Sequence, residues 1–349
     1  MGVIGVGTLG KRHAENLRRA IPAARLIAVA DADGARAEQV AAELEIEHHY
    51  ANWETLLERK DIDAVVVAAP SRFHAPVTRA AAVAGKHVFC EKPPALSMEE
   101  AESAASAVAR AGVQFQIGFM RRYDPPYLKA KKLIDAGDIG APVLVKSIGR
   151  DRQPPSRSFF QDGINGTLFL DAMIHEFDLA RWLMNDEVVE VHSFGSVLSC
   201  PELTEFRDVD SAVVNLRFER GGIGNAESHR KSNYGYDIRT EIIGSKGAIQ
   251  VGYLQQTAQL VLTAAGASHD VVDHWLVRFA DAYRNELQDF VDCIMAGKPA
   301  RVTAQDGLRA LAVSIAAERS YRESRPITLE PHLKLNTSTT KAGGSGTAR

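Results

Sequence analysis

The feature that most constrains the fold of this chain is a glycine-rich turn near its start. Gly5-Val6-Gly7-Thr8-Leu9-Gly10 has the form G-x-G-x-x-G, follows a short apolar run and precedes a helical pattern at 11–20. In such a turn the first glycine permits a tight reversal, the second lets the backbone approach a pyrophosphate, and the third lets helix and strand pack closely. The chain is therefore expected to begin with the strand–turn–helix unit of a dinucleotide-binding sheet.

An acidic residue stands where such a unit needs one. A second apolar run, 26–30, is followed directly by Asp31, which stands 21 residues after Gly10. A carboxylate there can accept hydrogen bonds from both hydroxyls of the adenosine ribose and repels a 2′-phosphate, so the sequence favours NAD over NADP. Arg36 lies near enough in sequence to keep NADP as the less favoured alternative. The competing interpretation is an ordinary turn followed by an acid at a strand end.

The order of apolar runs predicts two different architectures. Up to about residue 120, short apolar runs alternate with helical patterns, which is typical of a parallel, doubly wound sheet covered on both faces. Later, strand patterns follow one another with few helices between them, which indicates a mainly antiparallel sheet. The runs expected as strands are 3–6, 26–30, 64–68, 87–90 and 114–118, then 188–194, 211–218, 224–228, 239–243 and 248–251. The helices expected are 11–20, 35–44, 98–111, 127–136, 168–184, 280–294 and 304–321.

Composition excludes several classes of protein. Lys and Arg number 41 against 44 Asp and Glu, whereas proteins of nucleic-acid or membrane surfaces usually carry a basic excess. No apolar stretch is long enough to span a bilayer, and the first residues lack the basic region and apolar run of a secretory signal. Since only four residues precede Gly5, the first strand is expected to be short, which suggests a truncated or misassigned start.

The cysteines and histidines show no metal-ligand or disulfide spacing. Cys90, Cys200 and Cys293 are far apart and odd in number. We therefore expect neither a disulfide framework nor a zinc site, no metal at all, and a reducing, cytoplasmic setting.

Two groups of polar residues could carry chemistry. Lys92 lies in a turn, Glu91-Lys92-Pro93, directly after the fourth expected strand, where parallel sheets bind ligands. Asp171, His175 and Asp178 occur at i, i+4 and i+7, so they share one face if 168–184 is helical. A histidine beside carboxylates can accept a proton. Taken alone, the lysine also fits a solvated turn, and the helix fits an ordinary polar outer stripe.

Four motifs in one order resemble the glucose–fructose oxidoreductase/inositol dehydrogenase (Gfo/Idh/MocA) family, over about residues 1–325. They are the loop 5–10, the turn 91–93, the segment 118–125 (GFMRRYDP) and Asp171-x-x-x-His175-x-x-Asp178. Within the family, segments 150–155, 169–178 and 234–239 resemble the inositol 2-dehydrogenase branch.

The resemblance implies a domain organisation and an assembly. An NAD-binding Rossmann domain is expected over 1–120, and an α+β domain with an open, mainly antiparallel sheet over 121–330, serving substrate binding and oligomerisation. Residues 331–349 are expected to be disordered, because the end of the chain is rich in Ser, Thr and Gly. The expected partners are a small polyol or sugar and further copies of the chain, as a dimer or tetramer through that sheet.

The resemblance also implies residue roles. Lys92, Asp171 and His175 are expected to be catalytic, with His175 as the general base, Asp171 supporting it and Lys92 stabilising the developing alkoxide. Substrate contacts are expected from Arg122, Asp151, Asp178, Tyr236 and Tyr283. Cofactor contacts are expected from Gly5, Gly7, Thr8, Leu9, Gly10, Asp31, Ala69, Pro70, His74, Glu91 and Lys92.

The resemblance therefore implies NAD-dependent oxidation of a secondary alcohol of a cyclic, inositol-like polyol to the ketone. Three alternatives remain open at this point. The chain could be a dehydrogenase or reductase of a pyranose or anhydrosugar, an NAD-assisted glycoside-cleaving enzyme, or a non-catalytic NAD sensor, because fold similarity alone does not fix function.

Overall fold

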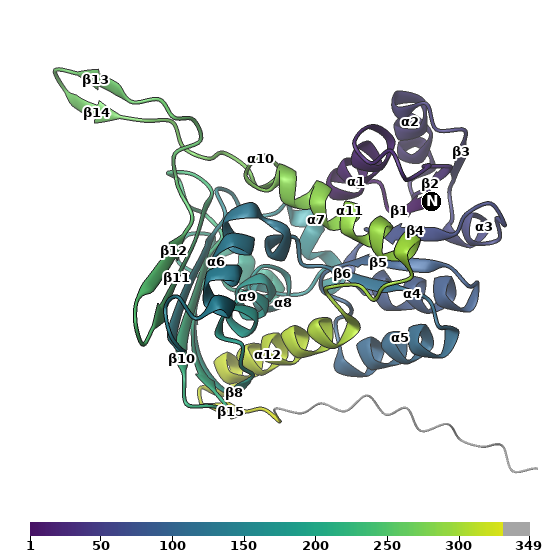
Figure 1. Cartoon of the computed structure of the whole chain (residues 1–349). Coiled ribbons are helices and arrows are strands. Elements are labelled where there is room, and N and C mark those ends of the chain that lie inside the picture. Colours follow the sequence, from purple (N-terminus) through teal and green to yellow (C-terminus); the bar gives the residue numbers. More distant parts are fainter. Residues whose placement is uncertain (331–349) are drawn as a thin grey trace, which may run out of the picture.

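The computed structural model of the chain describes residues 1–330, apart from the side chain of Asp162. The tail expected to be disordered, 331–349, lies outside the described residues. Two sheets form the body of the molecule, one from the first third of the chain and one from the remainder, with helices packed between and around them (Figure 1). Within residues 1–330, no helix is long and apolar enough to cross a bilayer.

The first sheet is fully parallel, as expected, with six strands in the order β3-β2-β1-β4-β5-β6. The chain reverses its direction of winding between β1 and β4, and such a switch point opens a crevice at the carboxyl ends of the strands. The strands are Gly2–Ile4 (β1), Ala28–Ala30 (β2), His48–Tyr50 (β3), Ala64–Val67 (β4), His87–Glu91 (β5) and Phe115–Gly118 (β6).

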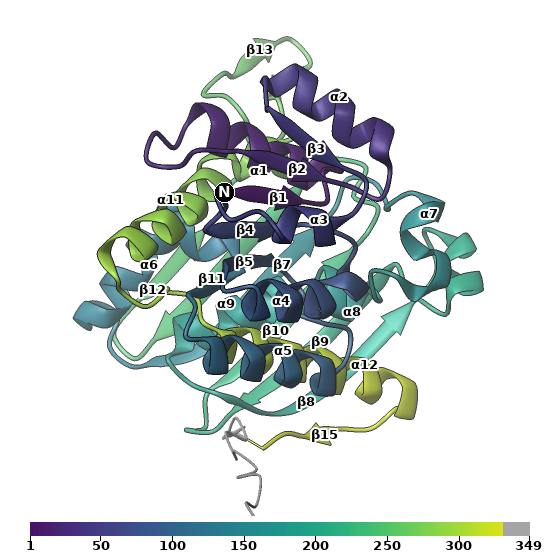
Figure 2. The same cartoon turned by 90° about the vertical axis from the view of Figure 1, so that its right-hand side faces the viewer.

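Helices cover both faces of this sheet, as its apolar strands require. On one face, Val3 and Phe89 pack against α1, α2 and the late helix α11; on the other, Ile4 and Val65 pack against α3, α4 and α5. A segment from near the end of the chain thus completes the core of the first sheet (Figure 2). The helices are Thr8–Arg19 (α1), Gly34–Leu44 (α2), Trp53–Leu57 (α3), His74–Val83 (α4), Met98–Ala111 (α5) and Ala280–Ala296 (α11).

The second sheet has seven strands in the order β12-β11-β7-β10-β9-β8-β15. All its neighbours are antiparallel except β7 and β10, so the expected mainly antiparallel sheet is confirmed with one parallel pair. The strands are Pro142–Arg150 (β7), Val188–Ser196 (β8), Ser211–Phe218 (β9), Ile223–His229 (β10), Asp237–Gly244 (β11), Ala248–Val251 (β12) and Ile327–Thr328 (β15).

One face of this sheet packs on helices that link it to the first sheet. Helix α12 contacts β8 and also β6 and α5, while α9 packs on β7. A hairpin of Val261–Thr263 (β13) and Gly266–Ser268 (β14) projects away from the body (Figure 1). The helices of this half are Pro125–Ala136 (α6), Arg157–Phe160 (α7), Leu168–Asp171 (α8), Ile174–Met184 (α9), Trp275–Arg278 (α10) and Ala304–Glu323 (α12).

Two differences from the sequence-based expectations concern the site. Strand β7 was not expected, because its apolar run, Val143–Val145, is only three residues long and is followed by Lys146, Ser147 and Gly149. The single helix expected over 168–184 is broken after Asp171 into α8 and α9. The solvent-facing polar stripe considered for this segment is also wrong, because almost every residue of α9 is buried.

Candidate active site

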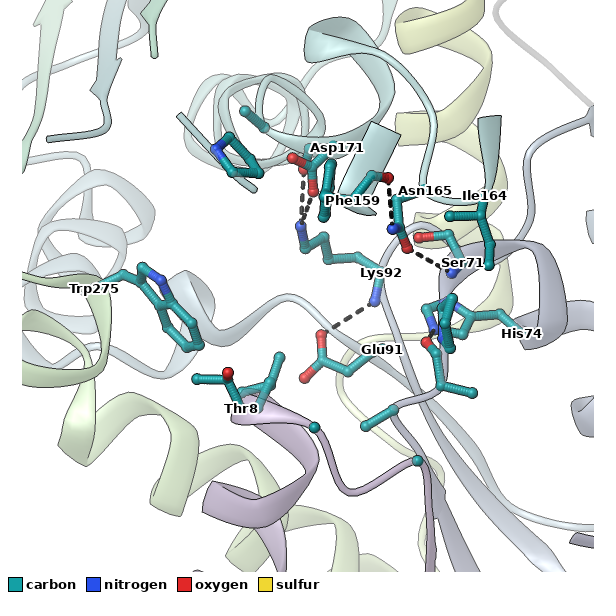
Figure 3. Close-up of a pocket in the computed structure, with 18 of the residues that line it drawn as sticks. Thr8, Ser71, His74, Glu91, Lys92, Phe159, Ile164, Asn165, Asp171 and Trp275 are labelled. Carbon is teal, nitrogen blue, oxygen red and sulfur yellow. Dashed lines mark hydrogen bonds and ion pairs between the residues drawn. The ribbon is translucent and has the colours of Figure 1, made fainter. Parts of the chain in front are cut away.

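One large cavity, of about 1320 Å³, lies at the carboxyl ends of the parallel strands and extends toward the second sheet. It is the crevice that a switch point between β1 and β4 predicts. Its wall includes the glycine turn, the Lys92 turn and the segment with Asp171 and His175, so the structure brings together motifs that are far apart in sequence (Figure 3).

The glycine turn has the geometry that a pyrophosphate requires. Gly5 has φ +83°, and a Cβ there would lie 2.5 Å from the backbone nitrogen of Ala69. A Cβ on Gly7 would meet no atom within 4 Å, which leaves the backbone open to a ligand. A Cβ on Gly10 would lie 1.8 Å from the carbonyl oxygen of Gly5, so only glycine lets α1 pack this closely. These residues fit a dinucleotide at the N-terminus of α1.

Every expected cofactor contact except Gly10 lines this cavity. Gly10 acts instead through the close approach of helix and strand. His74 is buried and bridges two loops, with Nδ1 2.7 Å from the carbonyl oxygen of Pro93 and Nε2 2.7 Å from that of Ala69. Glu91 accepts a hydrogen bond from the backbone N–H of Lys92 at 3.2 Å, which orders the turn on which the lysine stands.

Asp31 closes the glycine turn from the neighbouring strand. Its Oδ2 accepts from the N–H of Val6 at 2.8 Å, and its Oδ1 accepts from the N–H of Asp33 at 2.9 Å. The side chain lines the cavity and also pairs with Arg36 at 3.2 Å. Asp31 thus supports the turn from within, and its carboxylate also faces the cavity.

We expect Asp31→Ser to weaken NAD binding by about 10- to 100-fold, because hydrogen bonds to a charged group contribute roughly 1.5–3 kcal/mol. Titration of protein fluorescence with NAD measures the change. The matched control is Asp33→Asn, which keeps an acceptor for the N–H of Arg36 at the start of α2 and should bind NAD as the wild type does. Equal affinity of Asp31→Ser and wild type would remove Asp31 from the cofactor site.

Lys92 and Asp171 meet in the cavity. The Lys92 ammonium donates to Oδ1 of Asp171 at 3.1 Å and to the Asp171 carbonyl oxygen at 2.8 Å (Figure 3). That carbonyl is free because the helix breaks there: the N–H of His175, which it would bond in a continuous helix, bonds Ala172 instead. The break between α8 and α9 therefore creates a partner for the lysine.

His175 lies in the same wall in its neutral form. Burial, and then the positive charges of Lys92 and Arg121, hold the pKa of His175 well below its usual value. A neutral imidazole at neutral pH can accept a proton. Its Nδ1 has no hydrogen-bond partner among the described residues. Asp171, expected to support His175, is hydrogen-bonded instead to Lys92 and to Arg230.

Asp151, Tyr236 and Tyr283 also line the cavity, as expected of substrate contacts. Burial raises the pKa of Asp151 to about 6; the nearby cation Arg230 opposes the shift, and the carboxylate of Asp171 adds to it. Asp151 therefore titrates nearer to neutral pH than an ordinary carboxyl group.

If Asp151 contacts the substrate as expected, kcat/KM should fall as the pH is lowered through about 6, since a protonated carboxyl group no longer offers two acceptor oxygens to hydroxyl groups. A pH profile of initial rates at low substrate concentration measures this. In Asp151→Asn the fall near that pH should vanish and the rate should be lower throughout. Asp273→Asn, an exposed acid at the rim of the same cavity, should retain the fall. A profile of Asp151→Asn that matches the wild type would contradict the assignment.

Arg122 and Asp178 do not line this cavity, contrary to expectation. Arg122 donates to both carboxylate oxygens of Asp178, at 2.8 and 2.6 Å, and to Asp306 at 3.0 Å. The pair is almost fully buried, and Arg122 borders a second, smaller cavity. Of these two adjacent arginines, Arg121 lines the large cavity, and it pairs with Glu176.

Sequence reasoning missed several residues of the site. No regular spacing in the sequence points to Arg121 or Glu176. The packing of α9 on the segment 120–123 places both side chains in the cavity wall. Asn165 accepts from the N–H of Ser71 at 3.2 Å and donates to the carbonyl of Phe159 at 3.0 Å, which joins the two halves of the cavity wall (Figure 3). His13 does not line the cavity, but its Nε2 lies 2.7 Å from the carboxylate of Glu91, which does.

A glycine turn and the carboxylate of Asp31 at one end of a cavity, with a lysine–aspartate pair and a neutral imidazole at the other, define a dinucleotide-dependent oxidoreductase. The comparison with protein families identifies the family to which this oxidoreductase belongs. The chain belongs to the Gfo/Idh/MocA oxidoreductases: residues 1–119 match the family's NAD-binding Rossmann fold, and residues 131–329 match its C-terminal alpha/beta domain.

Characterised relatives are similar over almost their whole length. A scyllo-inositol 2-dehydrogenase (NAD(+)) of Bacillus subtilis is 41% identical over 94% of this chain and 95% of its own. A myo-inositol 2-dehydrogenase of Thermotoga maritima is 37% identical over 95% and 98%. The crystal structure of a scyllo-inositol dehydrogenase from Lactobacillus casei with NAD(H) and scyllo-inositol bound superimposes with a TM-score of 0.89, at 31% identity over 94% and 98%.

Proposed function

We propose that this protein is an NAD-dependent dehydrogenase that oxidises one secondary hydroxyl of an inositol to the ketone. The observation that carries the proposal is the meeting of Lys92, Asp171 and His175 in the cavity that also holds the glycine turn. The inositol dehydrogenases among its relatives support the choice of a cyclic polyol as the substrate class. When bound, NAD accepts the hydride from the carbon that carries the reacting hydroxyl.

The protein itself must take up the proton of that hydroxyl. His175 is neutral and lines the cavity, so it can take the proton as the hydride leaves. Lys92, held by Asp171, can donate a hydrogen bond to the same oxygen and stabilise the negative charge that develops on it. Asp171 therefore positions Lys92, whereas His175 acts as the general base.

The other cavity residues suit a substrate with many hydroxyls. Asp151 offers a carboxylate, Tyr236 and Tyr283 offer phenol groups, and Arg121 brings a guanidinium held by Glu176. Such a set can fix one face of an inositol ring by several hydrogen bonds at once, which presents a single carbon for reaction.

The proposal is tested by measuring NADH formation at 340 nm with an inositol panel (myo, scyllo, D-chiro) and a sugar panel (glucose, xylose, an anhydrosugar). We expect turnover with at least one inositol at a higher kcat/KM than with any sugar. Turnover on sugars alone would assign a pyranose or anhydrosugar dehydrogenase. Release of free sugar from glycosides without net NADH would assign a glycoside-cleaving enzyme, and NAD binding without any turnover would indicate a sensor.

We also propose a functional division of the chain and an assembly. Residues 1–120 would bind the cofactor, and residues 121–330 would bind the substrate and form the subunit contact.

The second sheet leaves Val143, Phe194, Val213 and Ile223 exposed, which suits a contact with a further copy in a dimer or tetramer. A cytoplasmic setting agrees with three free, buried cysteines. Light scattering coupled to gel filtration measures the subunit count.

A further inference from the structure

Arg230 is a buried arginine to which the reaction proposed above assigns no task. It follows β10, its side chain is 0% exposed, and it does not line the large cavity. Its Nη1 donates to Oδ2 of Asp171 at 3.3 Å, and its Nη2 donates to Oδ2 of Asp208 at 3.3 Å. A guanidinium without solvent needs anions beside it, and these two carboxylates supply them.

The two carboxylates lie at opposite ends of the short helix α8. Oδ1 of Asp208 accepts from the N–H of Leu168, the first residue of α8, at 2.9 Å, while Asp171 is its last residue. A helix of four residues is not stable by itself. Because Arg230 joins Asp208 to Asp171, one guanidinium ties the start of this helix to its end and fixes the direction of the Asp171 side chain.

Arg230 and Lys92 use different oxygens of Asp171. Lys92 binds Oδ1 at 3.1 Å, and Arg230 binds Oδ2. Burial by itself would raise the pKa of Asp171, but the two cations outweigh it and lower that pKa below its usual value. Asp171 is therefore an ionised, doubly held carboxylate, and the lysine ammonium rests on a fixed partner. Asp151 and Asp208 are the other carboxylates that face Arg230.

We propose that Arg230 is a positioning residue for the dehydrogenase reaction: it clamps Asp171 to Asp208 and thereby sets the place of the Lys92 ammonium beside the reacting hydroxyl. The proposal rests on the proposed function, in which Lys92 contacts that hydroxyl. Arg230 itself touches no substrate, since it lies behind Asp171. Misplacing a catalytic group by about 1 Å can cost 100-fold in rate, so removal of the clamp is expected to lower kcat by about 10- to 100-fold.

The test is a double-mutant cycle between Arg230→Gln and Lys92→Met, with kcat measured on the best inositol. Arg230→Gln alone should lower kcat, while NAD affinity stays that of the wild type because the glycine turn is elsewhere. In the Lys92→Met background the same change should cause no further loss, because the residue through which Arg230 acts is gone. The proposal would be overturned if Arg230→Gln lowered kcat by the same factor in the Lys92→Met background as in the wild type.

Two further variants separate positioning from folding. Arg230→Gln leaves Asp208 buried without its cation, so Arg230→Gln/Asp208→Asn, which removes both charges and keeps an acceptor for the N–H of Leu168, is measured beside it. It should fold and show the same loss of kcat; wild-type kcat would overturn the proposal. Arg239→Gln, which replaces a partly exposed arginine on β11, is the matched control and should keep wild-type kcat.

Chemical rescue tests the role of the charge. Guanidinium ion should restore part of the kcat of Arg230→Ala, whereas urea, a neutral molecule of similar shape, should not. Equal rescue by both would overturn the proposal. The two proposals fail differently: absence of turnover by the wild type on every polyol would overturn the proposed function and this inference with it, whereas wild-type turnover with multiplying losses would overturn this inference alone.

Discussion

Replacing His175 by alanine is expected to lower kcat by about 100- to 10,000-fold, the contribution that a positioned general base usually makes. The imidazole lines the cavity beside Lys92 and is neutral, so it is ready to take the proton at neutral pH. NAD affinity should not change, because the glycine turn and Asp31 remain intact. Initial rates of NADH formation and a binding titration with NAD measure the two quantities.

The matched control for that variant is His192→Ala. His192 is a partly buried histidine of β8 that does not line the cavity, so its loss should leave kcat unchanged. Full activity of His175→Ala would show that another group accepts the proton. An equal fall in both variants would trace the loss to damaged folding rather than to chemistry.

The second large effect is expected on stability. Arg122→Met should lower the free energy of unfolding by about 3–5 kcal/mol, because it leaves the buried carboxylate of Asp178 without its hydrogen-bonded partner and with only the more distant Arg181, 4.0 Å away. Burial already outweighs Arg122 and raises the pKa of Asp178. Without the arginine that pKa rises further, so protonation relieves the buried charge more easily. The loss of stability should therefore shrink as the pH is lowered. Urea unfolding at several pH values measures it.

The double variant Arg122→Met/Asp178→Leu is the control, since it removes both charges and should recover much of the stability. The same proteins test the placement of the pair outside the substrate cavity. Under conditions where it is folded, Arg122→Met should keep the wild-type KM for inositol, whereas Arg121→Met should raise it. A raised KM in Arg122→Met without a loss of stability would return Arg122 to the substrate site.

The cofactor half of the site could be predicted from the sequence because its signals are local. The glycine turn needs three glycines at fixed spacing. The structure shows the tight turn at Gly5 and the close packing at Gly10, and it leaves open space beside Gly7. Parallel strands also place their carboxyl ends on one edge, so the turn with Lys92 was expected near the glycine turn. The strand–helix alternation that precedes residue 120 likewise fixes the sheet class without any long-range information.

The substrate half depends on packing that local patterns do not contain. Arg121 and Arg122 are adjacent in a 3-10 helix, where neighbouring side chains point about 120° apart, so only one can face the cavity. Which one does is decided by partners far away in sequence, Glu176 and Asp178. Likewise, the i, i+4, i+7 spacing assumed one continuous helix, but the break after Asp171 turns its carboxylate toward Lys92 and Arg230.

The fate of the hydrogen on the reacting carbon tests most directly whether the protein transfers a hydride from the substrate to NAD. The protein is incubated with NAD and an inositol that carries deuterium in place of that hydrogen, and the reduced cofactor is analysed by mass spectrometry and NMR. We expect one deuterium at C4 of the nicotinamide for each ketone formed, and the same transfer at a lower rate in His175→Ala. Deuterium released to water, or a product formed without labelled NADH, would contradict this expectation.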